Sequence, residues 1–339
     1  MNFRPPRVPP KLVLALKIAV PVALVALLWR AVDWGAAFDL MQRANPVWLG
    51  AALVVLTLQT LLSAQRWRIT AAQLGLTLSY RTAVRDYYLA QVVNQSLPGG
   101  VVGDAGRAVR HRGAAGLLIS AQAVMFERLA GQIGMLAVLC FGLAVSVVVP
   151  TGMVWPLWLT APLGATLAGL AAVPVVLWGL AKFIGPSGTP LRQFIQAFKH
   201  AVAARNVLAA QIALSLGTAI CNVLAFALCA AALGLTLPLV VIATLVPLIL
   251  FAMLMPFSIG GWGYREGAAA LLFPLIGATS SAGLATSVTF GLMFLFSMFP
   301  GLLMSWMWPN SVPPDDLALN TLTDIKHRQT KRIFERKTP

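Results

Sequence analysis

The sequence predicts an all-α integral membrane protein, a polytopic helix bundle with about six to eight spans and two re-entrant segments broken by glycine and proline. Hydrophobic residues make up 59% of the chain and charged residues 10%, whereas soluble domains are about 25% charged. Mean hydropathy is +0.82. The net charge of +15 would suggest nucleic acid in a soluble protein, but the basic residues cluster between apolar runs, which is typical of membrane topology. We therefore expect no nucleic-acid partner.

The N-terminal part predicts two spans after a short basic segment. Residues 1–11, MNFRPPRVPPK, are basic and rich in proline, which disfavours a helix and favours a cytoplasmic position. The apolar run 12–29 is long enough for a first span, and no small-residue cleavage site follows it, as a signal peptide would require. A second span is predicted at 47–64, and Asn45 and Pro46 mark its start.

The first glycine-rich motif lies in the apolar piece 87–102, between arginine clusters at 66–86 and 107–112. If both clusters are cytoplasmic by the positive-inside rule, this piece must enter the membrane and return to the same side. Irregular backbone at membrane depth is tolerated only where it is buried in protein or lines a wet cavity. A re-entrant hairpin would therefore imply a cavity. The alternative is an interfacial amphipathic helix that ends at Pro98 and Gly99.

The apolar run 117–149 is interrupted only by Glu127 and Arg128. It is too long for one upright span. Either one strongly tilted helix holds the charged pair inside the membrane, or a rim helix precedes a span that begins near Leu129.

The chain is then predicted to turn outside at 150–156, return through a span at 158–180 and enter a cytoplasmic connection. Within that connection, residues 191–202 are predicted to form a short helix on the membrane surface. Its apolar residues have helical spacing: Leu191, Phe194, Ile195 and Phe198. The next span is predicted at 207–233.

The C-terminal part contains a second glycine-rich motif, PFSIGGWGYREG, at 256–267. The apolar runs on either side are 239–255 and 268–276, and the latter is too short for a span. This favours a second hairpin, which enters from the outer side. A last span at 283–308 closes a single transmembrane domain over 12–310, and the basic tail 311–339 is predicted to be cytoplasmic.

In both motifs a proline is followed by a glycine pair and then by an acid and an arginine, in either order: Pro98, Gly99, Gly100, Asp104 and Arg107, and Pro256, Gly260, Gly261, Arg265 and Glu266. Interrupted segments in corresponding places of two halves, entering from opposite faces, suggest an inverted repeat with a site at the midplane.

Acidic residues are rare in the apolar part of the chain. Between Tyr87 and Pro314 they are Asp104, Glu127 and Glu266, each within three residues of an arginine. Charges inside a membrane are expected to face the protein interior and to be paired. Because neighbouring residues on a helix point in different directions, we expect each acid to find its partner elsewhere in the fold. The predicted network comprises Asp104, Arg107, Glu127, Arg128, Arg265 and Glu266.

Three stretches carry a family resemblance: NQSLPGGVVGDAGRAVR, FERLAGQ and PFSIGGWGYREG. In this order they resemble the signature stretches of the lysylphosphatidylglycerol synthase transmembrane-region family, whose members are also called flippase-like. The resemblance covers the chain from the first span to Trp308. Longer members carry a soluble aminoacyltransferase domain, and we expect this chain to be a standalone form without it.

The resemblance implies lipid translocation across the bacterial inner membrane, for an anionic phospholipid, an aminoacyl-lipid or an isoprenoid- or hopanoid-type lipid. Backbone N–H groups at the glycines can bind anions, arginine can hold a lipid phosphate, and Asn94 and Gln95 can supply neutral hydrogen bonds. The predicted headgroup site comprises Asn94, Pro98, Gly99, Gly100, Gly103, Asp104, Arg107, Glu127, Arg128, Pro256, Gly260, Gly261, Gly263, Arg265 and Glu266.

Two other functions remain open. An accessory or structural role in an envelope-lipid pathway, beside lipid-biosynthesis enzymes, would give the motifs a folding role only. A membrane-embedded lipid transferase is less favoured, because the sequence has no nucleophile elbow and no metal-ligand cluster. We expect no catalytic residue, metal or cofactor.

Overall fold

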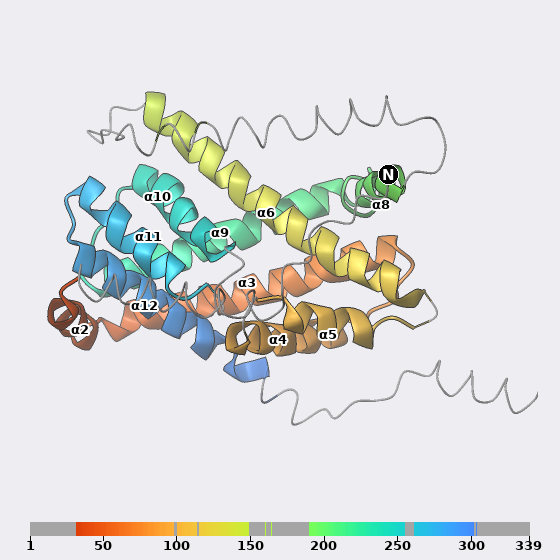
Figure 1. Cartoon of the computed structure of the whole chain (residues 1–339), viewed down its shortest axis with the longest axis horizontal. Helices are drawn as coiled ribbons and strands as arrows, with labels where there is room; N and C mark the ends of the chain where they lie inside the picture. The colour runs from red at the N-terminus through yellow and green to blue at the C-terminus, as the bar shows by residue number, and fades with distance from the viewer. Residues whose placement is uncertain are drawn as a thin grey trace, which may run out of the picture.

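The computed structural model describes residues 32–97, 100–113, 115–148, 190–254, 261–301 and 303, together with 160 and 164. Over these ranges the chain is all-α, as predicted, and contains no strand. Long helices pack against one another, and shorter helices lie along their sides and at their ends (Figure 1). The α-helices are α2 (Trp34–Gln42), α3 (Pro46–Gln73), α4 (Tyr80–Ser96), α5 (Val102–Arg110), α6 (Gly116–Val148), α8 (Pro190–Val202), α9 (Leu208–Ala232), α10 (Leu239–Phe251), α11 (Tyr264–Leu272) and α12 (Ser280–Ser297). Short 3₁₀ turns follow α10 (η1, Ala252–Leu254) and α11 (η2, Phe273–Ile276).

Four described helices are long and apolar enough to cross a membrane, judged by length and composition. They are Pro46–Gln73, Gly116–Ser146, Leu208–Ala232 and Ser280–Gly301. Each corresponds to a span predicted from the sequence. The predicted spans 12–29 and 158–180, apart from residues 160 and 164, lie outside the described residues, as do the N-terminal segment 1–11 and the tail 311–339.

Helix α3 starts as predicted but ends later. Asn45 Oδ1 accepts a hydrogen bond from the N–H of Val47 at 2.9 Å, so it caps the helix. The helix then continues past Ala64 to Gln73. Arg66 is therefore part of a helix interior and is only 4% exposed. Arg66 therefore does not belong to an exposed arginine cluster, because its side chain turns inward to a buried partner.

The run 117–149 forms one helix, α6, of 33 residues. At ~1.5 Å per residue it is about 50 Å long, well beyond the ~30 Å of the hydrocarbon core. It runs obliquely across its neighbours (Figure 1). The structure thus has the long helix rather than a rim helix followed by a span, and Glu127 lies fully buried within it.

Both glycine-rich motifs connect paired helices. Helices α4 and α5 are antiparallel, because Asp86 contacts Arg110 while Asn94 contacts Gly103. The two helices thus form a helical hairpin, which is the shape that the re-entrant alternative requires. In the second motif α10, α11 and η1 pack together.

The same order of elements occurs twice. A long helix, a hairpin and a further span make up α3, α4–α5 and α6, and again α9, α10–α11 and α12. The corresponding helices α3 and α9 pack in antiparallel directions, since Asn45 bonds Ala232 and Thr70 bonds Gln211. These two corresponding helices therefore run in opposite directions, as the predicted inverted repeat requires.

An identical pentapeptide strengthens this correspondence. The sequence LGLTL follows α3 at 74–78 and follows α9 at 233–237. Gly75 and Gly234 have φ of +83° and +80°. In each copy the N–H of the residue after the glycine bonds a carbonyl in the last turn of the helix, at 2.9 Å and 3.0 Å respectively. The two turns are the same helix-ending motif, which glycine makes possible.

The predicted helix at 191–202 is present as α8, but its aromatic face packs on protein. Phe194 and Phe198 meet the ring of Phe126 on α6 at centroid distances of 5.1 Å and 5.3 Å. The spacing predicted an amphipathic helix correctly. It did not distinguish a lipid surface from an apolar neighbour.

Candidate functional site

The first motif builds a tight hairpin. The N–H of Gly103 donates to Asn94 Oδ1 at 2.7 Å. A Cβ atom on Gly103 would lie 2.1 Å from the carbonyl oxygen of Ala90, so only glycine allows this approach. Asp104 and Arg107 are thereby held on a short helix that packs against α4.

A buried ionic network joins α3, α5 and α6. Asp104 Oδ1 lies 2.6 Å from Arg107 Nη2, and Arg128 holds both oxygens of Asp104 at 3.1 Å and 2.9 Å. Glu127 lies 2.7 Å from Arg66 and 3.5 Å from Arg107. Three guanidinium groups thus face two carboxylates.

Aromatic rings enclose the centre of this network. The guanidinium of Arg107 lies 4.6 Å from the ring of Trp67 and 4.5 Å from that of Tyr87. Such cation–π contacts are strongest where water is excluded, and Arg107 is 1% exposed. The hydroxyl of Tyr87 also donates to Glu127 Oε1 at 3.2 Å.

The second motif forms a separate ion pair. Arg265 Nη2 lies 2.6 Å from Glu266 Oε1, although the two residues are adjacent in sequence. The prediction that each acid pairs with a more distant residue is wrong for this pair. Glu266 folds back to accept the N–H of Gly263 at the start of α11, and the long arginine side chain reaches the same place. Ser287 of α12 completes the group by donating to Glu266 at 3.2 Å.

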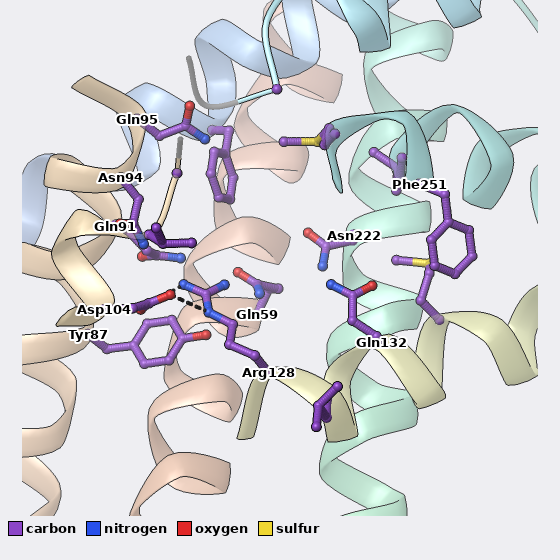
Figure 2. Close-up of a pocket in the computed structure, with 18 of the residues that line it drawn as sticks. Gln59, Tyr87, Gln91, Asn94, Gln95, Asp104, Arg128, Gln132, Asn222 and Phe251 are labelled. Atoms are coloured by element: carbon purple, nitrogen blue, oxygen red, sulfur yellow. Dashed lines mark hydrogen bonds and ion pairs between the residues drawn. The ribbon is translucent and has the colours of Figure 1, made fainter. Parts of the chain in front are cut away.

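A cavity of about 530 Å³ lies between the two motifs. Gly100 and Asp104 line it from the first motif and Gly261 from the second. Most of its polar lining consists of carboxamide side chains, namely Gln59, Gln91, Asn94, Gln95, Gln132 and Asn222. Figure 2 shows Gln91, Asn94, Asp104 and Tyr87 on one side and Gln132, Asn222 and Phe251 on the other, with Arg128 reaching between them.

One face of α6 combines polar and apolar lining. It contributes Met125, Arg128, Leu129, Gln132 and Met135, which recur at helical spacing. Met125 and Leu129 are 44% and 39% exposed. The cavity therefore opens beside apolar side chains and presents polar groups further along the same helix.

Comparison with known families identifies the class of protein. The model of the lysylphosphatidylglycerol synthase transmembrane region matches residues 12–301. The chain belongs to this family. No curated protein and no solved structure gave a significant match. The family resemblance of the three sequence stretches is thereby confirmed, and with it the assignment as a membrane protein.

The site residues predicted for this family member fall into three groups. Residues that line the cavity are Asn94, Gly100, Asp104, Arg128 and Gly261. Residues that contact the lining are Gly103, Arg107, Glu127 and Arg265, and Glu266 joins Arg265 to Gly263. Pro98, Gly99, Pro256 and Gly260 lie outside the described residues. The predicted ionic network is divided between the two motifs.

Sequence reasoning missed several lining residues and one buried arginine. Gln59 and Asn222 lie within apolar helices, and Gln132 ends the stretch FERLAGQ. Polar residues within a span mark functional positions. That signal was available but was applied only to charged residues. Arg66 was missed because it lies beside Arg68 in the sequence and was counted with it.

Proposed function

We propose that this protein binds a membrane lipid by its headgroup in the cavity and moves it between the leaflets of the bacterial inner membrane. The observation that carries the proposal is the composition of the cavity. Carboxamides and Arg128 can replace the hydration of a headgroup, while Met125 and Leu129 at the opening suit the first part of an acyl or prenyl chain. A headgroup without such replacements would cross ~30 Å of hydrocarbon at a high energetic cost.

The arrangement of the two halves supports transport rather than storage. Helices from both halves line one cavity, and in transporters with inverted repeats such a site lies between the repeats. Movement of the halves relative to each other would expose the cavity to each face in turn. We place both termini in the cytoplasm and regard lipid-biosynthesis enzymes as possible partners. The proposed activity needs no covalent step.

The proposal is tested with the purified full chain in phospholipid vesicles. Phosphatidylglycerol with a fluorescent acyl chain is added, and reduction of the outer-leaflet dye by dithionite reports exchange between leaflets. We expect faster exchange than in protein-free vesicles. Arg128→Gln should slow exchange about tenfold, because a charge-assisted hydrogen bond contributes ~1.5 kcal/mol or more.

Arg110→Gln is the matched control. Its side chain is 41% exposed, the same as that of Arg128, and it too pairs with a buried aspartate, but it does not line the cavity. This variant should exchange lipid as wild type does. Wild-type protein that is no faster than empty vesicles would contradict the proposed function.

A structural or accessory role is the second candidate. The specific observation in its favour is the Arg66–Glu127–Arg107 group, which ties three helices together and is buried throughout. Under this alternative, substitutions at Gln132 or Asn222, which take no part in that group, would leave every activity of the protein unchanged.

A further inference from the structure

We infer that the cavity takes an anionic headgroup in which a phosphodiester adjoins free hydroxyl groups, as in a glycerol or a sugar, and not a cationic aminoacylated headgroup. This rests on the proposed function and specifies its substrate class. The argument uses the charge at the cavity wall, the carboxamide lining and two unpaired buried atoms.

The ionic network at the cavity wall has a net positive charge. Among the described lining residues, Asp104 and Arg128 are the charged ones. Behind them Arg66 and Arg107 face Glu127, so the whole network has one guanidinium in excess. Arg128 lines the cavity, and its Nε and Nη2 donate hydrogen bonds to Asp104. Its Nη1 makes no hydrogen bond to any described residue. This Nη1 can donate a hydrogen bond to one phosphate oxygen.

A cationic headgroup would find no free acid. Both oxygens of Asp104 already accept hydrogen bonds from arginine, and both oxygens of Glu127 do the same. Glu127 is also fully buried. An ammonium group placed in the cavity would meet Arg128, and the one carboxylate among the described lining residues, Asp104, is already paired with two arginines. This arrangement is repulsive.

The carboxamides suit hydroxyl groups. Each carboxamide offers donors and an acceptor side by side, so it can serve a hydroxyl that donates one hydrogen bond and accepts another. Gln132 and Asn222 lie opposite Asn94 across the cavity (Figure 2). A headgroup that carries only charged groups would gain little from neutral side chains that both donate and accept hydrogen bonds.

Two buried atoms on the cavity wall lack partners. Asn94 Nδ2 is an unpaired donor and Gln95 Oε1 an unpaired acceptor among the described residues. Asn94 is 8% exposed, and its Oδ1 is already committed to Gly103. Leaving such atoms unpaired is unfavourable. A hydroxyl group of the lipid can accept a hydrogen bond from a donor such as Asn94 Nδ2 and can donate one to an acceptor such as Gln95 Oε1.

The test is equilibrium binding by the full chain in a polyoxyethylene detergent, because a maltoside would present hydroxyl groups of its own. The probe is phosphatidylglycerol with a fluorescent acyl chain. Competitors are unlabelled phosphatidylglycerol, phosphatidic acid, monoglucosyl diacylglycerol, phosphatidylcholine, lysylphosphatidylglycerol and the water-soluble glycerophosphoglycerol.

We expect phosphatidylglycerol to compete best. Monoglucosyl diacylglycerol lacks the phosphate and should bind about tenfold more weakly or worse, whereas phosphatidic acid lacks the hydroxyl groups and should lose about two- to tenfold. Phosphatidylcholine and lysylphosphatidylglycerol should compete most weakly. Equal or tighter binding of either of these two would overturn the inference.

Single substitutions show which residues produce the preference for phosphatidylglycerol. Arg128→Gln should abolish the preference for phosphatidylglycerol over monoglucosyl diacylglycerol, whereas Arg128→Lys should keep most of it. Gln132→Leu should reduce the preference over phosphatidic acid. Arg110→Gln should change neither. If the preference survives Arg128→Gln, Arg128 does not bind the phosphate and the inference is overturned.

Failure of the inference and failure of the proposed function give different results. If glycerophosphoglycerol competes as well as the intact lipid, the headgroup chemistry stands and the lipid-transport function is wrong. If phosphatidylglycerol crosses vesicles but all headgroups bind equally, transport stands and the headgroup inference is wrong.

Discussion

Arg66 on α3 and Glu127 on α6 form an ion pair of 2.7 Å in which both side chains are buried. The pair joins two membrane-length helices at a point where neither charge has access to water. Removing one member leaves an uncompensated charge in the interior, which is far more destabilising than losing a surface pair.

Glu127→Ala should therefore lower the free energy of unfolding by about 3–5 kcal/mol. Thermal unfolding of the detergent-solubilised protein, followed by tryptophan fluorescence, measures the change. Arg66→Met combined with Glu127→Met should recover part of the loss relative to Glu127→Met alone, because the two charges leave together. An unchanged unfolding temperature for Glu127→Ala would show that the pair is not buried as described.

Tyr87→Phe separates the hydrogen bond of Tyr87 from its ring contact. The substitution removes the donor to Glu127 Oε1 but keeps the ring beside Arg107. We expect a loss of about 1.5–3 kcal/mol, typical of a hydrogen bond to a charged group. Tyr88→Phe is the matched control, since Tyr88 is similarly buried and its hydroxyl makes no hydrogen bond to any described residue. In the same thermal measurement, Tyr87→Phe should be more destabilising than Tyr88→Phe. Equal losses for the two variants would show that the hydrogen bond to Glu127 is unimportant.

Gly103→Ala should disrupt the first hairpin. The new methyl group would lie 2.1 Å from a backbone oxygen of α4, so α5 must move. Gly106→Ala on the same helix meets nothing within 4 Å and should be neutral or stabilising by up to ~1 kcal/mol. Limited proteolysis and unfolding temperature measure both. Equal tolerance of the two substitutions would argue against the close packing of α4 and α5.

The opposite directions of the halves predict where two exposed threonines lie. Thr77 and Thr236 occupy the same place in the two LGLTL turns, and α3 and α9 are antiparallel. In a background that lacks Cys140, Cys221 and Cys229, Thr77→Cys and Thr236→Cys should react with a membrane-impermeant maleimide from opposite faces. Labelling of both from one face would contradict the inverted arrangement.

Much of the fold followed from the sequence because long apolar runs have few alternatives in a membrane. Asn45 and Pro46 marked the start of α3, and the glycine-rich turn marked the first hairpin. The end of α3 was wrong because charge counting treats every arginine as a topology signal, whatever its partner. Only tertiary structure shows that Arg66 faces Glu127.

Side-chain pairing was harder to predict than helix position. Arg265 and Glu266 point in different directions at Cβ, yet their flexible side chains converge at the start of α11. The internal repeat had a sequence signal that short motif comparison overlooked, namely the two identical pentapeptides. The polar lining of the cavity was missed because single carboxamides in an apolar helix carry no charge.

The identical turns have a consequence for how the chain inserts. Because the same five residues end a helix at opposite ends of the bundle, the turn itself cannot specify an orientation. Its flanks differ: Arg68 and Arg81 surround the first copy, whereas no charged residue occurs between Arg205 and Arg265 around the second. Basic flanks are retained in the cytoplasm during insertion. We therefore predict that arginines outside the turn direct its two copies to opposite faces, and that moving those arginines to the second copy changes the orientation in which the chain inserts.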